Sequence, residues 1–387
     1  MKTATEHLIA LLLCALLAAC ASRPPALPAA ELLHDELFAP SREVIDADSV
    51  FALSEDMRRY AAAEFQAPSQ PRDPRHALID ALYSRRQLGL CYDASVTRSA
   101  AEAYAARAGN CLSLVIMTAA FAKHLGLPVS YRSVLTDDLY TRQGDLYMAS
   151  GHVNLVLDRL PSRSPFGAQE ASALTIDFLP QEELRGQRSV PLAERTIVSM
   201  FMNNRAAEAL SRGRLDDSYA WAREAVRQDP EFSAAVNTLG VVYMRAGHLR
   251  QAEAALRAVL SREPDHVSAL SNLVLLLQRA GRQDESQALG ERLAQLQPNP
   301  PFHFFDLGRK AMNDGDFRRA RQFFARELRR QPDQHEVHFW AAQAELRLGD
   351  TASAASHLRQ AMDNSPTRDS HDLYATKLDR LRAARVQ

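Results

Sequence analysis

The first half of this chain of 387 residues is organised by the stretch Gly109-Asn110-Cys111-Leu112-Ser113-Leu114. An apolar run continues from Leu112 to Leu125 and is ended by Gly126 and Pro128, so we predict a buried helix that starts at Cys111. A thiol at a helix N-terminus faces unpaired backbone N–H groups and the positive end of the helix dipole, and both favour the thiolate. The position of Cys111 therefore predicts a reactive cysteine.

Two short apolar runs, at residues 151–157 and 174–178, follow this helix. Each is short enough to be a strand, and they carry His152 and Asp177, respectively. A cysteine, a histidine and an aspartate in this order supply a nucleophile, a base and a residue that orients the base. Asn154 lies on the same strand face as His152, because side chains alternate along a strand. It is a candidate either for an oxyanion donor or for a structural support of the triad.

The sequences GNCLSL, GHVNLVL and TIDFLP, in that order, resemble the Cys-His-Asp core of bacterial transglutaminase-like proteins. The resemblance covers roughly residues 75–195 and implies an α+β papain-like domain, in which a helix begun by the cysteine packs on an antiparallel sheet. Cys111, His152 and Asp177 occupy the matching positions. It implies acyl transfer from an amide, by transamidation, deamidation or peptide hydrolysis, and does not choose among these. Members of this superfamily also lose activity while keeping the fold.

Helix and strand signals predict the elements around the proposed triad. We expect helices at residues 48–65, 73–88 and 99–107, a strand at 129–135, a polar loop at 136–150 that lies over the site, and an exposed loop at 161–172. The passage at 179–198 is too short for a free linker, so we expect it to dock the second half of the chain firmly against the first.

The N-terminus resembles a bacterial lipoprotein signal. The apolar stretch Leu8–Ala19 is too short to span a bilayer and ends in Leu17-Ala18-Ala19-Cys20. We expect a signal peptide at 1–19, followed at 20–45 by a lipidated Cys20 and a tether. Ala21 and Ser22 follow the cysteine, a pattern that resembles outer-membrane lipoproteins facing the periplasm. The alternative is an ordinary secretory peptide with a chance cysteine.

Composition limits the remaining classes. The 46 basic and 47 acidic residues nearly cancel, so nothing favours a nucleic-acid partner. The histidines of the second half lack the same-face spacing of a zinc site, and we expect neither a metal nor a cofactor. Of the four cysteines, Cys91 and Cys111 would remain beyond the signal. A disulfide between them would silence the nucleophile; the alternative is that Cys91 is buried.

The second half carries an internal repeat of 34 residues. Its markers are Pro230, Pro264, Pro298, Pro332 and Pro366, together with Gly213, Gly247, Gly281, Gly315 and Gly349. This pattern resembles the tetratricopeptide repeat, which implies an all-α solenoid. We place a repeat domain at 199–387, with units at about 199–232, 233–266, 267–300, 301–334 and 335–368 and a capping helix from Ser370. The first unit departs from the pattern, because Arg205 stands where Leu is usual.

In this repeat family the concave groove is lined by the first helix of each unit. The matching positions here are Asn203, Asn237, Arg245, Arg279, Phe305, Phe339 and Arg347. Such a groove could clamp an acidic peptide or a carboxylate terminus of a protein partner. The alternative is that these arginines form a solvated helix face.

Taken together, these patterns predict an exported, lipid-anchored cysteine amidase or acyltransferase in the bacterial cell envelope, whose repeats recruit a protein or peptide substrate. The alternative is a noncatalytic lipoprotein scaffold for an envelope or secretion complex, with a degenerate transglutaminase-like fold.

Overall fold

The structure is a computed structural model that describes residues 29–65, 73–83, 88–93, 96–143, 146–158, 173–178, 188–365 and 368–384. The predicted signal peptide and Cys20 lie outside the described residues. Within the described ranges, no helix combines the length and apolar character that crossing a bilayer requires.

The first half is built around one buried helix, α6 (Cys111–His124). Every residue from Leu112 to Ala122 is buried, as expected for a helix that is surrounded by other elements. The helices η2 (Asp48–Phe51), α4 (Pro74–Tyr83) and α5 (Ala100–Ala106) pack against it, and α3 (Glu55–Phe65) packs against α4. The short helices α2 (Ala29–Leu32) and η1 (Asp35–Leu37) lie instead against helices of the second half. The prediction of one helix over 48–65 is wrong, because Ala52 is extended at the end of η2 and Ser54 then accepts a hydrogen bond from the N–H of Met57.

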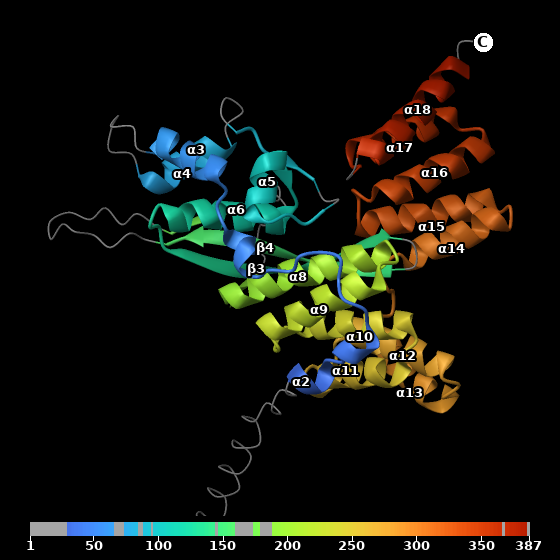
Figure 1. Cartoon of the computed structure of the whole chain (residues 1–387). Coiled ribbons are helices and arrows are strands. Elements are labelled where there is room, and N and C mark those ends of the chain that lie inside the picture. Colours follow the sequence, from blue (N-terminus) through green and yellow to red (C-terminus); the bar gives the residue numbers. More distant parts are fainter. Residues whose placement is uncertain are drawn as a thin grey trace, which may run out of the picture.

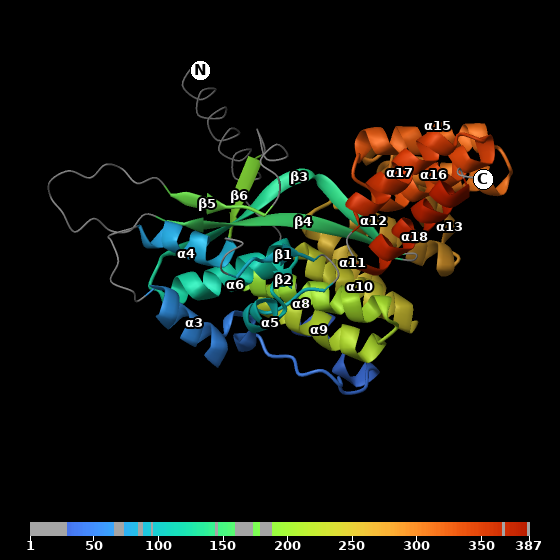
Figure 2. The same ribbon diagram turned by 90° about the horizontal axis from the view of Figure 1, so that it is seen from above.

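One side of α6 packs against a four-stranded antiparallel sheet (Figure 2). Its strands, in the order β5-β4-β3-β6, are β3 (Val129–Gln143), β4 (Leu146–Leu157), β5 (Leu174–Ile176) and β6 (Arg188–Leu192). A small parallel pair, β1 (Cys91–Tyr92) and β2 (Ala108–Gly109), lies just before α6.

The predicted loop at 136–150 is wrong. Strands β3 and β4 continue through most of it as a hairpin, with a register shift between Val134 and Leu139 and pairing that resumes at Leu139 opposite Ser150. Polar composition alone suggested a loop, but an antiparallel ladder satisfies the backbone groups whatever the side chains are.

The second half consists of five helix pairs and a final helix (Figure 1). The pairs are α8 (Glu194–Ser211) with α9 (Leu215–Gln228), α10 (Ser233–Ala246) with α11 (Leu249–Arg262), α12 (Val267–Arg279) with α13 (Gln283–Leu296), α14 (His303–Asn313) with α15 (Phe317–Arg330), and α16 (His335–Leu348) with α17 (Thr351–Asp363), before α18 (Arg368–Ala384). The repeated glycines lie between the two helices of each pair, with φ between 73° and 86°. Such left-handed turns favour glycine. Because each helix pair has one such turn, the glycine recurs once in every repeat of 34 residues.

The two halves share one hydrophobic core. Strand β6 belongs to the sheet of the first half, and after Ala193 alone the chain enters α8. A single cluster of buried side chains runs from Leu32 through Phe121 to Leu277. The expected start of the repeats at residue 199 therefore falls inside a helix, and separate smaller cores serve the last two pairs.

The described part of the segment predicted as a tether at 20–45 packs against the helix pairs of the second half. Residues 32–43, which we call the N-terminal strap, run along the first two helix pairs (blue in Figure 1). The backbone N–H of His34 donates to the hydroxyls of Tyr219 (2.9 Å) and Tyr243 (3.1 Å). Phe38 stacks on Tyr219 with 4.1 Å between ring centroids. These contacts with distant residues hold the strap in place. The proline-rich sequence that precedes the strap gave no sign of them.

Candidate functional site

Cys111 is the first residue of α6, as predicted. Asn110 caps the helix with an extended backbone, and its side-chain oxygen accepts the N–H of Ser113 at 2.9 Å. This cap is a property of the local sequence, because asparagine at this position satisfies one of the unpaired N–H groups of the first turn. The thiol is half-buried and forms no disulfide.

His152 lies on β4 opposite Val134 of β3 and is 3% exposed. Asp177 directly follows β5, whose Ile176 pairs with Leu155 of β4. The sheet therefore brings the two side chains together, with 2.6 Å between His152 Nε2 and Asp177 Oδ1. Neighbouring strands thus place this pair of side chains next to each other.

The Cys111 thiol lies close enough to the His152 imidazole to act on its ionisation, as Asp177 does. Burial alone would lower the pKa of His152, but the interactions with Asp177 and Cys111 outweigh it and raise the pKa to about 9. The two acidic groups stabilise the imidazolium, which is why the pKa of His152 is raised. The site therefore holds a proton where a leaving group could receive it.

Of the two roles considered for Asn154, oxyanion donor and structural support, its contacts match the structural support. Its Nδ2 donates to Asp177 Oδ2 at 3.3 Å, and the residue is 7% exposed. Its Oδ1 has no hydrogen-bond partner among the described residues. Asn154 therefore holds Asp177 from the same strand face as His152.

Tyr92 is a neighbour of Cys111 that the sequence did not reveal. The pairing of β1 with β2 places Tyr92 opposite Gly109, two residues before the cysteine. Its hydroxyl lies near Cys111, and desolvation, followed by the charge of the nearby thiol, raises the pKa of Tyr92 to about 12. Since 57% of Tyr92 is exposed, the desolvation concerns the hydroxyl rather than the ring. A two-residue strand is too short to show a pattern that could have predicted this contact.

Cys91, on the same short strand, is exposed and free. The prediction that it is buried is wrong, and the described structure contains no bridge between it and Cys111. Its side chain has only a weak contact of 3.9 Å to the carbonyl of Gly89.

The polar residues expected in the repeat groove lie on the first helices of their units. Asn237 Oδ1 accepts a hydrogen bond from Asn272 Nδ2 at 3.0 Å, which links α10 to α12. Arg245 and Arg279 are exposed in the last turns of these two helices, and the exposed Arg347 lies 5.6 Å over the ring of Phe317. Asn203 Oδ1, on α8, is buried without a hydrogen-bond partner among the described residues.

The two aromatic residues expected in the groove are both packed against other aromatic rings, Phe305 fully and Phe339 partly buried. Phe305 is fully buried against Phe324, so its assignment to a groove is wrong. Phe339 packs on Tyr374 of α18, with 5.4 Å between ring centroids. Both rings contribute to the packing of their units, because the helical period also places core residues at these spacings.

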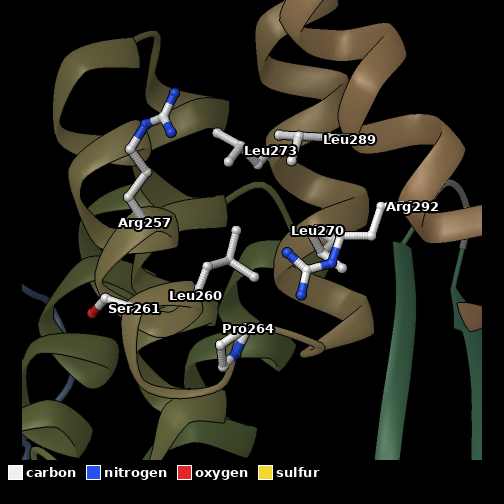
Figure 3. Close-up of a pocket in the computed structure, with 8 residues that line it drawn as sticks. All are labelled: Arg257, Leu260, Ser261, Pro264, Leu270, Leu273, Leu289 and Arg292. Carbon is white, nitrogen blue, oxygen red and sulfur yellow. The ribbon is translucent and has the colours of Figure 1, made fainter. Parts of the chain in front are cut away.

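A shallow pocket lies between α11, α12 and α13 (Figure 3). Its apolar lining includes Leu260, Leu270 and Leu273, and Arg257 and Arg292 flank it. Both arginines form ion pairs, Arg257 with Glu253 and Arg292 with Asp265. None of the triad residues lines the pocket, and we assign it no catalytic role.

Comparison with known proteins identifies the repeats. Residues 209–274 and 305–369 each match a family model of the tetratricopeptide repeat, so the second half carries tetratricopeptide repeats, a module that binds peptides or proteins. No curated protein matches the chain.

Several solved structures are similar to part of the chain. YrrB, described as a TPR protein with an unusual peptide-binding site, is 20% identical, with 46% of this chain and 92% of that chain covered and a TM-score of 0.25. PilF of Pseudomonas aeruginosa is 19% identical, covering 49% and 94%, with a TM-score of 0.29. MamA of AMB-1 is 21% identical, covering 45% and 100%, with a TM-score of 0.25.

Proposed function

We propose that the protein is a cysteine-dependent amidase or acyltransferase with a transglutaminase-like, papain-like first domain, and that its repeats recruit the protein or peptide substrate. The observation that carries the proposal is the buried imidazole of His152, which lies 2.6 Å from Asp177 Oδ1 and has the Cys111 thiol as a neighbour. A nucleophile, a base and an orienting carboxylate in contact are the parts that acyl transfer requires.

In the proposed reaction the Cys111 thiolate attacks the amide carbonyl carbon and forms a C–S bond. The C–N bond then breaks as the His152 imidazolium gives its proton to the leaving nitrogen, which leaves a thioester. Water or an amine attacks the thioester and gives a proton to His152, and the C–S bond breaks to restore the thiolate and the imidazolium. Asp177 stays ionised throughout and stabilises the imidazolium.

The backbone N–H of Cys111 is the natural donor to the oxyanion of the tetrahedral intermediate. The Tyr92 hydroxyl lies near Cys111. The substrate oxygen would therefore bind beside this hydroxyl, and the exposed Tyr92 ring would lie next to the bound amide.

The alternative function is a noncatalytic scaffold, in which the first domain only supports the repeats. One observation favours it: the Tyr92 hydroxyl lies near Cys111, where the substrate oxygen would have to bind. In this alternative the thiol has no chemical role.

Thiol alkylation separates the two functions. We expect iodoacetamide at neutral pH to modify Cys111 much faster than Cys91, because the imidazolium of His152 holds its partner as the more reactive thiolate. Cys91 is exposed and free in the same molecule, so it is a built-in reference, and peptide mass mapping distinguishes the two. A Cys111 that reacts no faster than Cys91 would favour the scaffold.

We also propose that the chain is anchored to the outer membrane, facing the periplasm, through a lipid on Cys20, because Leu17-Ala18-Ala19-Cys20 follows a short apolar run. Several acyl chains on one cysteine anchor a protein far more firmly than a single chain. We expect a radiolabelled fatty acid to be incorporated into the wild type but not into the Cys20→Ala variant, and equal labelling of both would refute the anchor.

For the repeats, we propose that Arg245, Arg279 and Arg347 attract an acidic segment of the substrate, because all three are exposed on first helices. Replacing them together by alanine should raise KM for a protein substrate by several-fold and weaken its salt dependence. Hydrolysis of a small model amide should be unchanged. Equal loss on both substrates would mean that the arginines only support the fold.

A further inference from the structure

A second polar network lies between α8 of the first repeat and the loop that precedes α5. Its centre is Thr97, which is 1% exposed. Three residues of α8 contact it: the Thr97 N–H donates to Glu208 Oε1 at 2.7 Å, Asn204 Nδ2 donates to Thr97 Oγ1 at 3.3 Å, and Arg205 Nη1 donates to its carbonyl oxygen at 3.3 Å. The first repeat therefore holds Thr97 by its N–H, its hydroxyl and its carbonyl.

The same Thr97 hydroxyl contacts the cap of the Cys111 helix. Asn110 Nδ2 donates to Thr97 Oγ1 at 2.9 Å, while Asn110 Oδ1 accepts the N–H and the hydroxyl of Ser113. The next residue, Arg98, donates its backbone N–H to the Ser113 hydroxyl at 2.8 Å. Both residues of the cap are thus fixed by the loop at 97–98, and Cys111 lies between them in the sequence.

We infer that Thr97 is a positioning residue, through which the first repeat sets the orientation of the α6 N-terminus and the reactivity of Cys111. The inference rests on the proposed function and extends it, because it makes the repeats part of the support of the reactive thiol as well as a binding module. It also explains why the first unit departs from the repeat pattern, since Arg205 replaces the usual Leu in order to reach Thr97.

The network is closed on its other side by the N-terminal strap. Arg205 Nη2 donates to Glu43 Oε2 at 3.1 Å, and Trp221 Nε1 donates to the same oxygen at 2.8 Å. Glu208 has its second oxygen, Oε2, buried without a partner among the described residues, and desolvation raises its pKa. A buried carboxylate with one unpaired oxygen costs stability. We therefore take the hydrogen bond from Thr97 to Glu208 as more than a packing contact between the two halves.

The test measures the alkylation rate of Cys111 as a function of pH, with the rate of Cys91 in the same molecule as reference. In Thr97→Val the volume is kept but the hydroxyl that holds Asn110 is lost, and we expect Cys111 to react about tenfold more slowly at neutral pH, since a weakened cap loosens the helix N-terminus. In Thr97→Ser the hydroxyl remains, and we expect the rate to stay within about twofold of the wild type.

Glu194 offers a matched control on the same helix. It also joins α8 to the first domain, but it contacts Tyr131 and Lys123, at the far end of α6 from Cys111. We expect Glu208→Ala to slow the alkylation of Cys111 and Glu194→Ala to leave it unchanged, with the thermal midpoint of each variant measured alongside. Glu208→Gln, which keeps an acceptor for the Thr97 N–H, should retain most of the rate.

The outcomes are distinct. If Cys111 of the wild type reacts no faster than Cys91, the proposed function fails and this inference with it. If the wild type is fast and Thr97→Val matches Thr97→Ser, only the inference is overturned. Equal slowing in Glu194→Ala and Glu208→Ala would also overturn it, because the contacts would then act through docking of the repeats in general.

Discussion

Replacing Cys111 with alanine is expected to abolish turnover on any amide substrate, and replacing His152 with alanine to come close to it. Without the thiol no thioester forms; without the imidazole no group beside the thiol holds a proton for the leaving nitrogen. In triads that act as a unit, loss of the nucleophile or the base costs about 10⁶-fold in kcat, and the double loss costs little more. We therefore expect Cys111→Ala, His152→Ala and the double variant to have nearly the same residual rate.

Cys91→Ser is the control for this series. Cys91 lies one residue before Tyr92 and is exposed, so a chemical requirement for any nearby thiol would affect it too. We expect full activity in Cys91→Ser. If instead the effects of Cys111→Ala and His152→Ala multiply in the double variant, the two residues do not act together, and the catalytic role assigned to their contact is incorrect.

Replacing Asp177 with asparagine is expected to lower kcat by about 10² to 10⁴. The change keeps the shape of the side chain but removes the charge that stabilises the His152 imidazolium. The geometry can survive, because Asn154 has an unpaired Oδ1 and can rotate its amide to accept from the new NH₂ group. The loss should therefore be one of charge rather than of folding.

The pH dependence gives this prediction a second measurement. The pKa of His152 is raised from 6.5 to about 9 in the folded protein, so the stabilisation by its protonated form is fully present below pH 6.5 and is lost as the pH rises through about 9. At about 1.4 kcal/mol for each pKa unit, it amounts to about 3 kcal/mol.

We expect activity to fall above about pH 9 in the wild type and the alkaline limb to move to lower pH in Asp177→Asn. The free energies of unfolding of wild type and Asp177→Asn should also converge as the pH rises toward 9. Asn154→Ala removes only the 3.3 Å contact to Asp177 and serves as the milder comparison. An unchanged limb in Asp177→Asn would show that the carboxylate does not set the titration of His152.

The parts of the site that could be predicted from the sequence are those with a local cause. The apolar run after Cys111 predicts a helix that starts there, and short apolar runs predict the strands that carry His152 and Asp177. The glycines and prolines of the repeats are likewise local signals for turns and helix ends.

The parts that could not be predicted depend on contacts between distant residues. Thr97 is one polar residue in an unremarkable loop until α8, more than a hundred residues later, folds over it. The exposure of Cys91 and the contact of Tyr92 with Cys111 follow from the pairing of β1 with β2, which no two-residue pattern encodes. Phe305 shows the opposite error, since a family position suggested a surface that packing against Phe324 closes.

The N-terminal strap also has a consequence for the order in which the chain can mature. The tyrosines that hold the backbone of His34 and Leu32, Tyr219 and Tyr243, lie 185 to 211 residues later. At synthesis rates of about 5 to 20 residues per second, they follow the strap by roughly 10 to 40 seconds. The strap therefore has to wait for its partners before it can pack. A chain that stops before Tyr243 would leave the strap, including the aromatic ring of Phe38, without its packing partners. Such a chain would be a target for protein quality control.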